Sequence, residues 1–174
     1  MNYKGKLHNI KAFIFDYDGV LTDGMIYTSG KDLNIVLRNG NVKDGYAIQY
    51  ALKLGFKVAV ISGGRGNSIK QRLEMLGIKD VFLKVKEKLS VYENYLKCNH
   101  LTKENVLYMG DDIPDYDIMV NSGVATCPSD AAEEIKQVAD YISNKKGGEG
   151  CVRDVIEQVL RLQGLWFNEK AKEW

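Results

Sequence analysis

Short apolar runs rich in β-branched and aromatic residues alternate along this chain with longer segments in which apolar residues recur every three or four positions. The short runs predict buried β-strands, and the longer segments predict amphipathic helices with one core-facing stripe. The clearest helical stripe comprises Val152, Val155, Ile156, Val159 and Leu160. The strands are expected at residues 12–15, 58–61, 81–83, 106–109, 124–126 and 141–142. This alternation predicts an α/β fold in which helices cover both faces of a parallel sheet.

Residues 25–39 interrupt this alternation. Their pattern predicts two short strands around the polar residues 29–32, and therefore a β-hairpin that stands beside the first strand end as a flap. No internal repeat or low-complexity linker divides the rest of the sequence. We expect a single domain over residues 1–174, with residues 164–174 as a C-terminal tail.

The composition is that of a globular chain and argues against several classes of function. Of 174 residues, 45% are hydrophobic and 27% are charged, and the net charge is +1. This balance gives no reason to expect nucleic acid or an anionic membrane as a partner. No apolar run approaches the roughly 20 residues that span a bilayer, and residues 1–11 are polar and basic. Since these first residues contain no apolar signal segment either, we expect a cytoplasmic protein. Three scattered cysteines predict neither disulfides nor a zinc site.

The first predicted strand ends at two aspartates, Asp16 and Asp18, which are followed by Gly19. If the extended backbone continues past Asp16, both carboxylates point the same way and share one small space. Such a pair is tolerated when a cation neutralises it or one carboxyl keeps its proton, and oxygen ligands favour Mg²⁺. From these residues alone, an acidic turn at a strand end is an equally good interpretation.

Three further polar motifs follow predicted strand ends. They are Ser62-Gly63-Gly64-Arg65-Gly66, the lysine run Lys84, Lys86 and Lys88, and the aspartates Asp111, Asp112 and Asp115 around Pro114. The glycine-rich turn offers N–H groups, a hydroxyl and an arginine to a phosphate, and a lysine at a helix start favours an anion nearby. Each motif alone is also explained by turns, helix caps or surface charge. Because the carboxyl ends of parallel strands share one edge, together they predict one site.

In this order and spacing, the motifs resemble the four motifs of the haloacid dehalogenase (HAD) superfamily of phosphatases. Further features are similar to the group that acts on 3-deoxy-D-manno-octulosonate (KDO) 8-phosphate, over nearly the whole chain. These features are Thr22-Asp23-Gly24, residues 41–48, residues 147–155 and Gly164-Leu165-Trp166. The resemblance implies a HAD-like Rossmannoid sheet and a Mg²⁺-dependent phosphatase of lipopolysaccharide precursor synthesis.

The resemblance also implies a role for each motif residue. Asp16 would attack phosphorus and carry an aspartyl-phosphate, while Asp18 would protonate the leaving oxygen and later activate water. Mg²⁺ would be held by Asp16, the backbone carbonyl of Asp18 and Asp111, and Asp112 and Asp115 would support that loop. Ser62 and Lys88 would bind the phosphoryl oxygens.

Substrate binding is expected from five further positions: Lys43, Asp44, Gly63, Arg65 and Arg72. A sugar acid also needs a planar bidentate partner for its carboxylate, which Arg65, Arg72 or Arg153 could supply. Many relatives have arginine directly after the Ser/Thr-Gly pair, whereas this chain has Gly64 there and arginine one place later. The departure leaves a nine-carbon 2-keto-3-deoxy sugar acid 9-phosphate open as an alternative substrate.

The segments between the motifs are too short for a cap domain, so something else must cover the site. In the resembled group, neighbouring subunits of a tetramer do so, with hairpins at the centre and tails reaching adjacent sites. Residues suited to such contacts are the apolar hairpin residues Ile26, Ile35 and Leu37, and the tail residues Trp166, Phe167 and Trp174, which are expected to be exposed. A homotetramer with active sites at subunit interfaces is therefore expected.

Two alternatives belong to other classes of protein. A receiver-like module also has a phosphoacceptor aspartate, an acidic cluster, a Ser/Thr and a lysine, but it keeps its phosphoryl group. Asp18 argues against a receiver because it can act as an acid for a poor leaving group, and the early position of the phosphoacceptor also argues against it. A non-catalytic member of the family that serves in an assembly has little support, because no motif position is missing.

Overall fold

The computed structural model describes residues 3–28 and 36–172. Its centre is a parallel six-stranded sheet with the strand order β5-β4-β1-β6-β7-β8. The strands are β1 (Ala12–Phe15), β4 (Lys57–Ile61), β5 (Asp80–Phe82), β6 (Val106–Met109), β7 (Val124–Cys127) and β8 (Tyr141–Ile142). All six strands predicted from apolar runs are confirmed to within one residue at each end.

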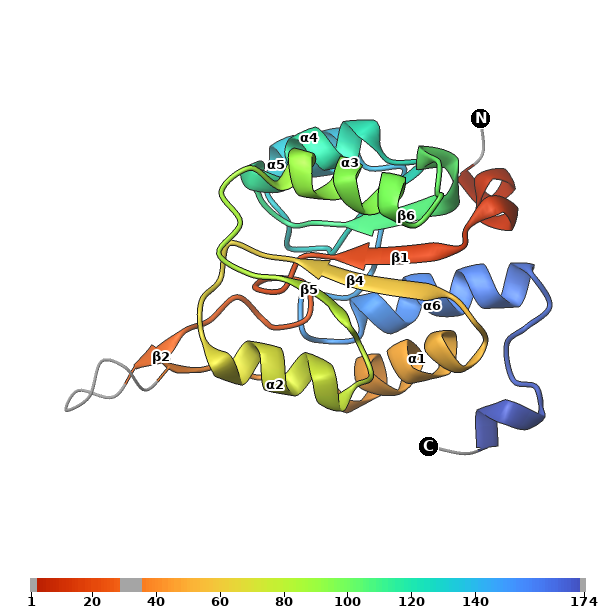
Figure 1. The fold of residues 1–174 in the computed structure, drawn as a ribbon, viewed down its shortest axis with the longest axis horizontal. Helices are drawn as coiled ribbons and strands as arrows, with labels where there is room; N and C mark the ends of the chain where they lie inside the picture. Colours follow the sequence, from red (N-terminus) through yellow and green to blue (C-terminus); the bar gives the residue numbers. More distant parts are fainter. Residues whose placement is uncertain (1–2, 29–35, 173–174) are drawn as a thin grey trace.

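Helices cover both faces of the sheet, with α3, α4 and α5 on one side and α1, α2 and α6 on the other (Figure 1). They are α1 (Val42–Lys53), α2 (Asn67–Met75), α3 (Lys88–Cys98), α4 (Tyr116–Asn121), α5 (Glu133–Val138) and α6 (Cys151–Leu162). The stripe predicted on α6 is buried along its whole length. Among the described residues, no helix is both long and apolar enough to cross a membrane.

Strand β1 lies in the middle of the sheet, paired with β4 on one side and β6 on the other. All four of its residues are buried, because alternate side chains enter the two cores between the sheet and its helix layers. Phe13 and Phe15 face α1 and α6, whereas Ala12 and Ile14 face the layer of α3 and α4. Asp16, which follows Phe15, therefore lies at the end of a strand that is buried on both faces.

A two-stranded antiparallel sheet, β2 (Tyr27–Thr28) with β3 (Val36–Leu37), forms the predicted hairpin. It projects from the edge where the parallel strands end (Figure 1). The expected turn at 29–32 and Ile35 lie outside the described residues. Ile26 and Leu37 are 54% and 62% exposed, so the hairpin presents an apolar surface. There is no separate cap among the described residues.

The described part of the tail packs on its own chain, which differs from the expectation of an exposed Trp166. The Trp166 ring meets Tyr50 edge-on at 5.5 Å, and the Arg153 guanidinium lies 5.3 Å from its centroid. Tyr50 also donates a hydrogen bond to the carbonyl of Leu165. A large ring in a polar tail gains more from burial against α1 and α6 than from exposure. Phe167 is 75% exposed as expected, and Trp174 lies outside the described residues.

Candidate active site

The carboxyl ends of β1 and β6 bring three carboxylates and one lysine together. Asp16 directly follows β1, and its N–H donates to the Met109 carbonyl at 3.0 Å. The first residue of α3, Lys88, is buried, and its Nζ lies 3.0 Å from Asp16 Oδ1 and 2.7 Å from Asp115 Oδ1. The predicted lysine at a helix start thus meets an anion, whereas Lys84 and Lys86 are exposed.

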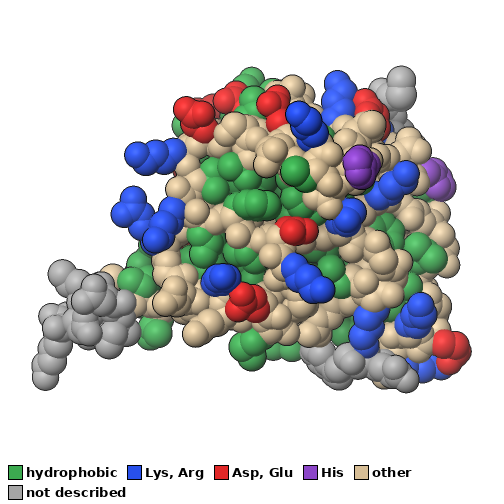
Figure 2. Space-filling model, in the orientation of Figure 1, with side chains coloured by type: hydrophobic (Ala, Val, Ile, Leu, Met, Phe, Trp, Pro, Cys, Tyr) green, Lys and Arg blue, Asp and Glu red, His purple; other side chains and the backbone are tan. Residues whose placement is uncertain are grey.

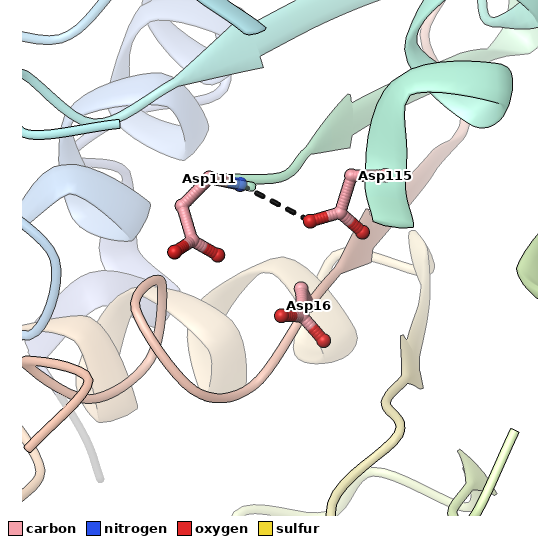
Figure 3. A group of neighbouring side chains, drawn as sticks. All are labelled: Asp16, Asp111 and Asp115. Atoms are coloured by element: carbon pink, nitrogen blue, oxygen red, sulfur yellow. Dashed lines mark hydrogen bonds between the residues drawn. The ribbon is translucent and has the colours of Figure 1, made fainter. Parts of the chain in front are cut away.

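The loop after β6 is organised by Asp115, which lies in the 3₁₀ turn Ile113–Asp115. Its carboxylate accepts hydrogen bonds from Lys88, from the Tyr108 hydroxyl and from the N–H of Asp111. These donors occupy both oxygens of Asp115. Figure 3 shows the carboxylate of Asp111 facing that of Asp16, with the N–H of Asp111 joined to Asp115.

Burial and mutual repulsion raise the pKa values of the acidic group. Burial, reinforced by the charge of Asp115, raises the pKa of Asp16 to about 7 although Lys88 opposes the shift. Burial and the charges of Asp16 and Asp115 raise the pKa of Asp111 to about 8. Burial alone would lower the pKa of Lys88, but the neighbouring Asp16 and Asp115 outweigh it and raise that pKa. When ionised, the three carboxylates carry more negative charge than the single lysine, Lys88, neutralises.

The donor set fits a hard divalent cation. Ligand oxygens of Asp16, Asp111 and Asp115 all lie within 4.8 Å of one another. Asp16 Oδ1 and Asp111 Oδ1 are buried without a hydrogen bond, since the ion pair of Lys88 with Asp16 falls short of hydrogen-bond geometry. Buried oxygens without donors and raised carboxyl pKa values are relieved by one bound Mg²⁺. Because Asp115 already has its donors, Asp16 and Asp111 are the available ligands.

The raised pKa values predict a pH-dependent stabilisation by Mg²⁺. Unfolded aspartates ionise near pH 4, whereas folded Asp16 and Asp111 keep protons until about pH 7 and 8. Without metal, the raised pKa values of Asp16 and Asp111 favour the folded state at low pH. This contribution is lost as the pH rises through about 7 and 8. Mg²⁺ competes with protons at low pH and neutralises the carboxylates at high pH. We expect millimolar Mg²⁺ to raise the thermal midpoint by several degrees at pH 8 and hardly at all at pH 5. Equal shifts at both pH values, or an unchanged shift in Asp111→Asn, would contradict the site.

Asp18 is not part of the group formed by Asp16, Asp111 and Asp115, and its carboxylate has a different partner. The backbone leaves the extended conformation after β1 and makes a helical turn, in which the N–H groups of Leu21 and Thr22 donate to the Tyr17 carbonyl. The Asp18 carboxylate instead accepts a bidentate pair from Arg38, with Nε 2.6 Å from Oδ1 and Nη2 3.3 Å from Oδ2. The condition for that expectation, an extended backbone past Asp16, is therefore not met.

Ser62 lies at the end of β4 beside this turn and is buried. Its Oγ accepts a hydrogen bond from the Gly64 N–H at 3.0 Å. A Cβ at Gly64 would lie 3.1 Å from Ser62 Oγ and 3.2 Å from Asp18 Oδ2. The space between the Ser62 hydroxyl, predicted to bind phosphate, and Asp18 is therefore narrow, and a side chain at position 64 would enter it.

Close backbone packing fixes the turn that holds Asp18. At Gly19, whose φ is +88°, a Cβ would lie only 2.0 Å from Asp111 Oδ2. A Cβ at Gly147 would lie 2.0 Å from the Gly19 carbonyl oxygen, and the Gly148 N–H donates to the Val20 carbonyl at 2.9 Å. Gly147 and Gly148, just before α6, therefore pack closely against the backbone of the turn that carries Asp18.

The remaining predicted residues differ in exposure and in their neighbours. Lys43, Gly63 and Arg65 are exposed. Asp112 is also exposed, and its Oδ1 accepts from the Ile113 N–H at 2.8 Å, as expected for a residue that supports the loop. Arg72 on α2 lies near Tyr17 and lines a cavity beside Asp18. Lys and Arg side chains line the left edge of the visible face, near the ends of the strands (Figure 2).

Asp44, predicted to bind substrate, and Arg153, one of three candidates for binding the substrate carboxylate, make structural contacts in this chain. Asp44 is buried, and its Oδ1 accepts from the Arg153 N–H at 2.7 Å, where α6 begins. Burial raises the pKa of Asp44 to about 6. The Arg153 side chain pairs with Glu157 and lies over the rings of Tyr46 and Trp166. These contacts join α1 to α6, and the substrate-binding roles expected for Asp44 and Arg153 stay predictions.

Replacing Asp44 with alanine should weaken the fold and spare the chemistry. The first turn of α6 loses a buried acceptor, so the free energy of unfolding should fall by about 2 kcal/mol. In urea denaturation, Asp44→Asn should recover part of this loss because its side chain keeps one acceptor oxygen. The kcat and KM of the folded Asp44→Ala protein should match those of the wild type. A large rise in KM with unchanged stability would restore the substrate-binding role.

Comparison with known proteins bears on the identity of this site. The sequence model of the haloacid dehalogenase-like hydrolase family matches residues 77–156. The KDO 8-phosphate phosphatase of Salmonella typhi is 36% identical over 169 residues, which cover 96% of this chain and 88% of that protein. The chain belongs to the HAD-like hydrolases, in the KDO 8-phosphate phosphatase group. The enzyme of the same name from Yersinia pestis is 34% identical, with coverage of 89% and 82%.

Solved structures of this phosphatase group have the same fold. The Yersinia pestis enzyme superposes with a TM-score of 0.91 at 32% identity and covers 94% of this chain and 88% of that one. The Moraxella catarrhalis enzyme, in complex with a magnesium ion, a phosphate ion and KDO, gives a TM-score of 0.89 at 30% identity. It covers 93% of this chain and 92% of that one.

Arg38 is the residue at the phosphatase site that motif analysis missed. It lies at the base of the hairpin, 20 residues after Asp18, and its side chain is only 10% exposed. The prediction of a hairpin over residues 25–39 placed Arg38 in a segment beside the site. No local pattern, however, distinguishes Arg38 from an ordinary charged residue next to a short strand.

Proposed function

We propose that this protein is a Mg²⁺-dependent phosphomonoesterase that hydrolyses KDO 8-phosphate to KDO and phosphate. The observation that carries the proposal is the buried cluster of Asp16, Lys88, Asp111 and Asp115 at the strand ends. Relatives that match nearly the whole chain carry the name of this activity, and one solved relative contains magnesium, phosphate and KDO. The reaction would supply lipopolysaccharide precursor synthesis.

In this proposal, Asp16 is the nucleophile. Its carboxylate attacks phosphorus, the bond to the sugar oxygen breaks, and an aspartyl-phosphate forms. The carboxylates of Asp16 and Asp111, with the Asp18 carbonyl, would hold Mg²⁺, which neutralises charge on the phosphoryl oxygens when it is bound. Water then attacks the phosphorus, the bond between phosphorus and the Asp16 oxygen breaks, and inorganic phosphate and the Asp16 carboxylate result.

Lys88 and Ser62 are proposed to bind the phosphoryl group. The lysine contacts Asp16 within a buried site, where its charge is weakly screened and can offset charge on the equatorial oxygens. The contact with Asp115 fixes the ammonium in place before substrate arrives. The Ser62 hydroxyl can rotate to donate to an oxygen on the other side.

Asp18 is proposed to donate a proton to the departing sugar oxygen and to take one from the attacking water. Both of its oxygens are occupied by Arg38. An acid needs an oxygen that faces the leaving group. We propose that the ion pair opens, at least in part, during each turnover, so that an oxygen of Asp18 can face the leaving group.

We further propose that one phosphatase domain per chain assembles into a homotetramer. The exposed apolar residues of the hairpin support such an interface: Met25, Ile26, Tyr27 and Leu37 are each more than half exposed. A monomeric mass by light scattering, with full activity, would refute the assembly. We also place the enzyme in the cytoplasm, because its cysteines are free, as in reducing compartments.

The experiment that tests the proposed function is Mg²⁺-dependent phosphate release from a panel of phosphomonoesters. The panel contains KDO 8-phosphate, its nine-carbon analogue and common hexose phosphates. We expect KDO 8-phosphate to have the highest kcat/KM by at least tenfold. If the nine-carbon acid leads, the chemistry stands and the substrate assignment changes. If a hexose phosphate leads, the sugar-acid proposal is wrong.

A further inference from the structure

A cavity of about 290 Å³ lies between the base of the hairpin and α2. Its lining includes Tyr17, Arg38, Ser68 and Arg72. The two arginines come from different elements, Arg38 from the segment after β3 and Arg72 from the last turn of α2. Two guanidiniums and a hydroxyl around one space offer several hydrogen-bond donors to an anion.

This cavity adjoins the catalytic centre through Asp18. Arg38, part of its wall, holds both oxygens of that carboxylate. On its other side, Asp18 Oδ2 lies near the Gly64 backbone and Ser62. Asp18 therefore lies between Ser62, which is predicted to bind phosphate, and Arg38 in the wall of the cavity.

The cavity carries more positive charge than its neighbours neutralise. Arg38 is paired with Asp18, but within residues 3–28 and 36–172 Arg72 has no ion pair with a carboxylate. Burial raises the pKa of Tyr17, the charge of Asp18 adds to this shift, and both arginines oppose it. Both guanidiniums therefore lie near Tyr17, and both line the cavity. In the described part of the chain, Arg72 is therefore available to attract an anion.

We propose that this cavity binds the carboxylate of a sugar-acid phosphate, and that Arg38 exchanges Asp18 for the substrate carboxylate. The proposal rests on the proposed phosphatase function. A guanidinium fork fits either carboxylate equally well, and Arg72 supplies the second charge that favours the incoming one. The exchange frees both oxygens of Asp18 for proton transfer. An acidic substrate thus binds in the cavity and at the same time releases the general acid.

The test compares substrates with and without a carboxylate on one set of variants. The substrates are KDO 8-phosphate and ribose 5-phosphate, both sugar-alkoxide leaving groups. The variants are Arg38→Ala, Arg38→Lys and Arg72→Ala, with Arg161→Ala as the matched control. Arg161 is an exposed arginine on α6 that pairs with Glu157. Rates on ribose 5-phosphate report whether a variant is folded and chemically competent.

In Arg38→Ala, we expect the ratio of kcat/KM for KDO 8-phosphate to that for ribose 5-phosphate to fall about tenfold to a hundredfold, mainly through KM. Arg38→Lys keeps the charge without the fork and should lie between Arg38→Ala and the wild type. Arg72→Ala should reduce the ratio by a smaller factor, and Arg161→Ala should leave it unchanged. Free KDO should inhibit the wild type more strongly than Arg38→Ala.

Two results would overturn the assignment. If Arg38→Ala lowers kcat on both substrates equally, Arg38 only positions Asp18. If the ratio is unchanged, the carboxylate binds elsewhere. Either result leaves the proposed function standing, provided that the wild type still prefers KDO 8-phosphate. A wild type that prefers ribose 5-phosphate refutes the proposed function itself, and the cavity assignment with it.

Discussion

Asp16→Asn is expected to lower kcat for phosphate release by about 10⁴-fold or more, because an amide cannot serve as the nucleophile. The same change should leave the protein folded. It removes a buried negative charge beside Asp111 and Asp115, and Lys88 keeps its pair with Asp115. At pH 8 without metal, the thermal midpoint of the variant should equal or exceed that of the wild type. Loss of activity without loss of stability would mark a residue used in chemistry.

The matched control is Asp117→Asn, an exposed aspartate in the first turn of α4. This variant also replaces a carboxylate with an amide, but outside the proposed site, and it should keep the activity of the wild type. Phosphate release and thermal denaturation should be measured on both variants in the same buffer. If Asp16→Asn retains more than about one-hundredth of the wild-type kcat, another group is the nucleophile.

Lys88→Ala has the second-largest expected effect, and it should affect both rate and stability. We expect kcat to fall by about 10²-fold or more, since a preorganised charge beside the phosphoryl group is lost. The sequence alone predicts that the fold remains intact in this variant. Because Lys88 is buried between Asp16 and Asp115, its removal leaves two carboxylates uncompensated, which should cost about 3 kcal/mol of stability.

Lys88→Met separates the two effects, because it keeps most of the side-chain volume without the charge. Its kcat should be as low as that of Lys88→Ala at a temperature where both variants are folded. Lys86→Ala, which removes an exposed lysine two residues earlier, should change neither rate nor stability. Wild-type turnover in folded Lys88→Met would refute the role of Lys88 in binding the phosphoryl group.

The sheet could be predicted from the sequence because its strands are buried on both faces. Such strands form continuous apolar runs, and each run ends where the first polar side chain reaches the edge of the sheet. For this reason Asp16, Ser62 and Asp111 could be expected at one edge before any coordinates were known. Lys88 could be expected at the same edge, because a positive charge at a helix start is unfavourable unless an anion lies nearby.

Residues whose side chains depend on tertiary packing could not be placed in this way. Asp18 was expected beside Asp16, but the chain turns immediately after β1, and Arg38 comes from a hairpin 20 residues away. Asp44 lies in a segment that resembles the phosphatase group, yet its carboxylate faces α6. Sequence similarity identifies such positions without showing which way a side chain points. Contacts between distant segments, as between Trp166 and Tyr50, have no local signal.

The central claim is that phosphate passes through Asp16 on its way to water. The most direct test is a rapid acid quench of the wild type with KDO 8-phosphate labelled at phosphorus, followed by mapping of the labelled peptide. The account predicts that label appears on the peptide containing Asp16 and is lost within a turnover when unlabelled substrate is added. Phosphate release with no label on that peptide at any quench time would contradict it. Label that stays on Asp16 without phosphate release would instead indicate a receiver-like module.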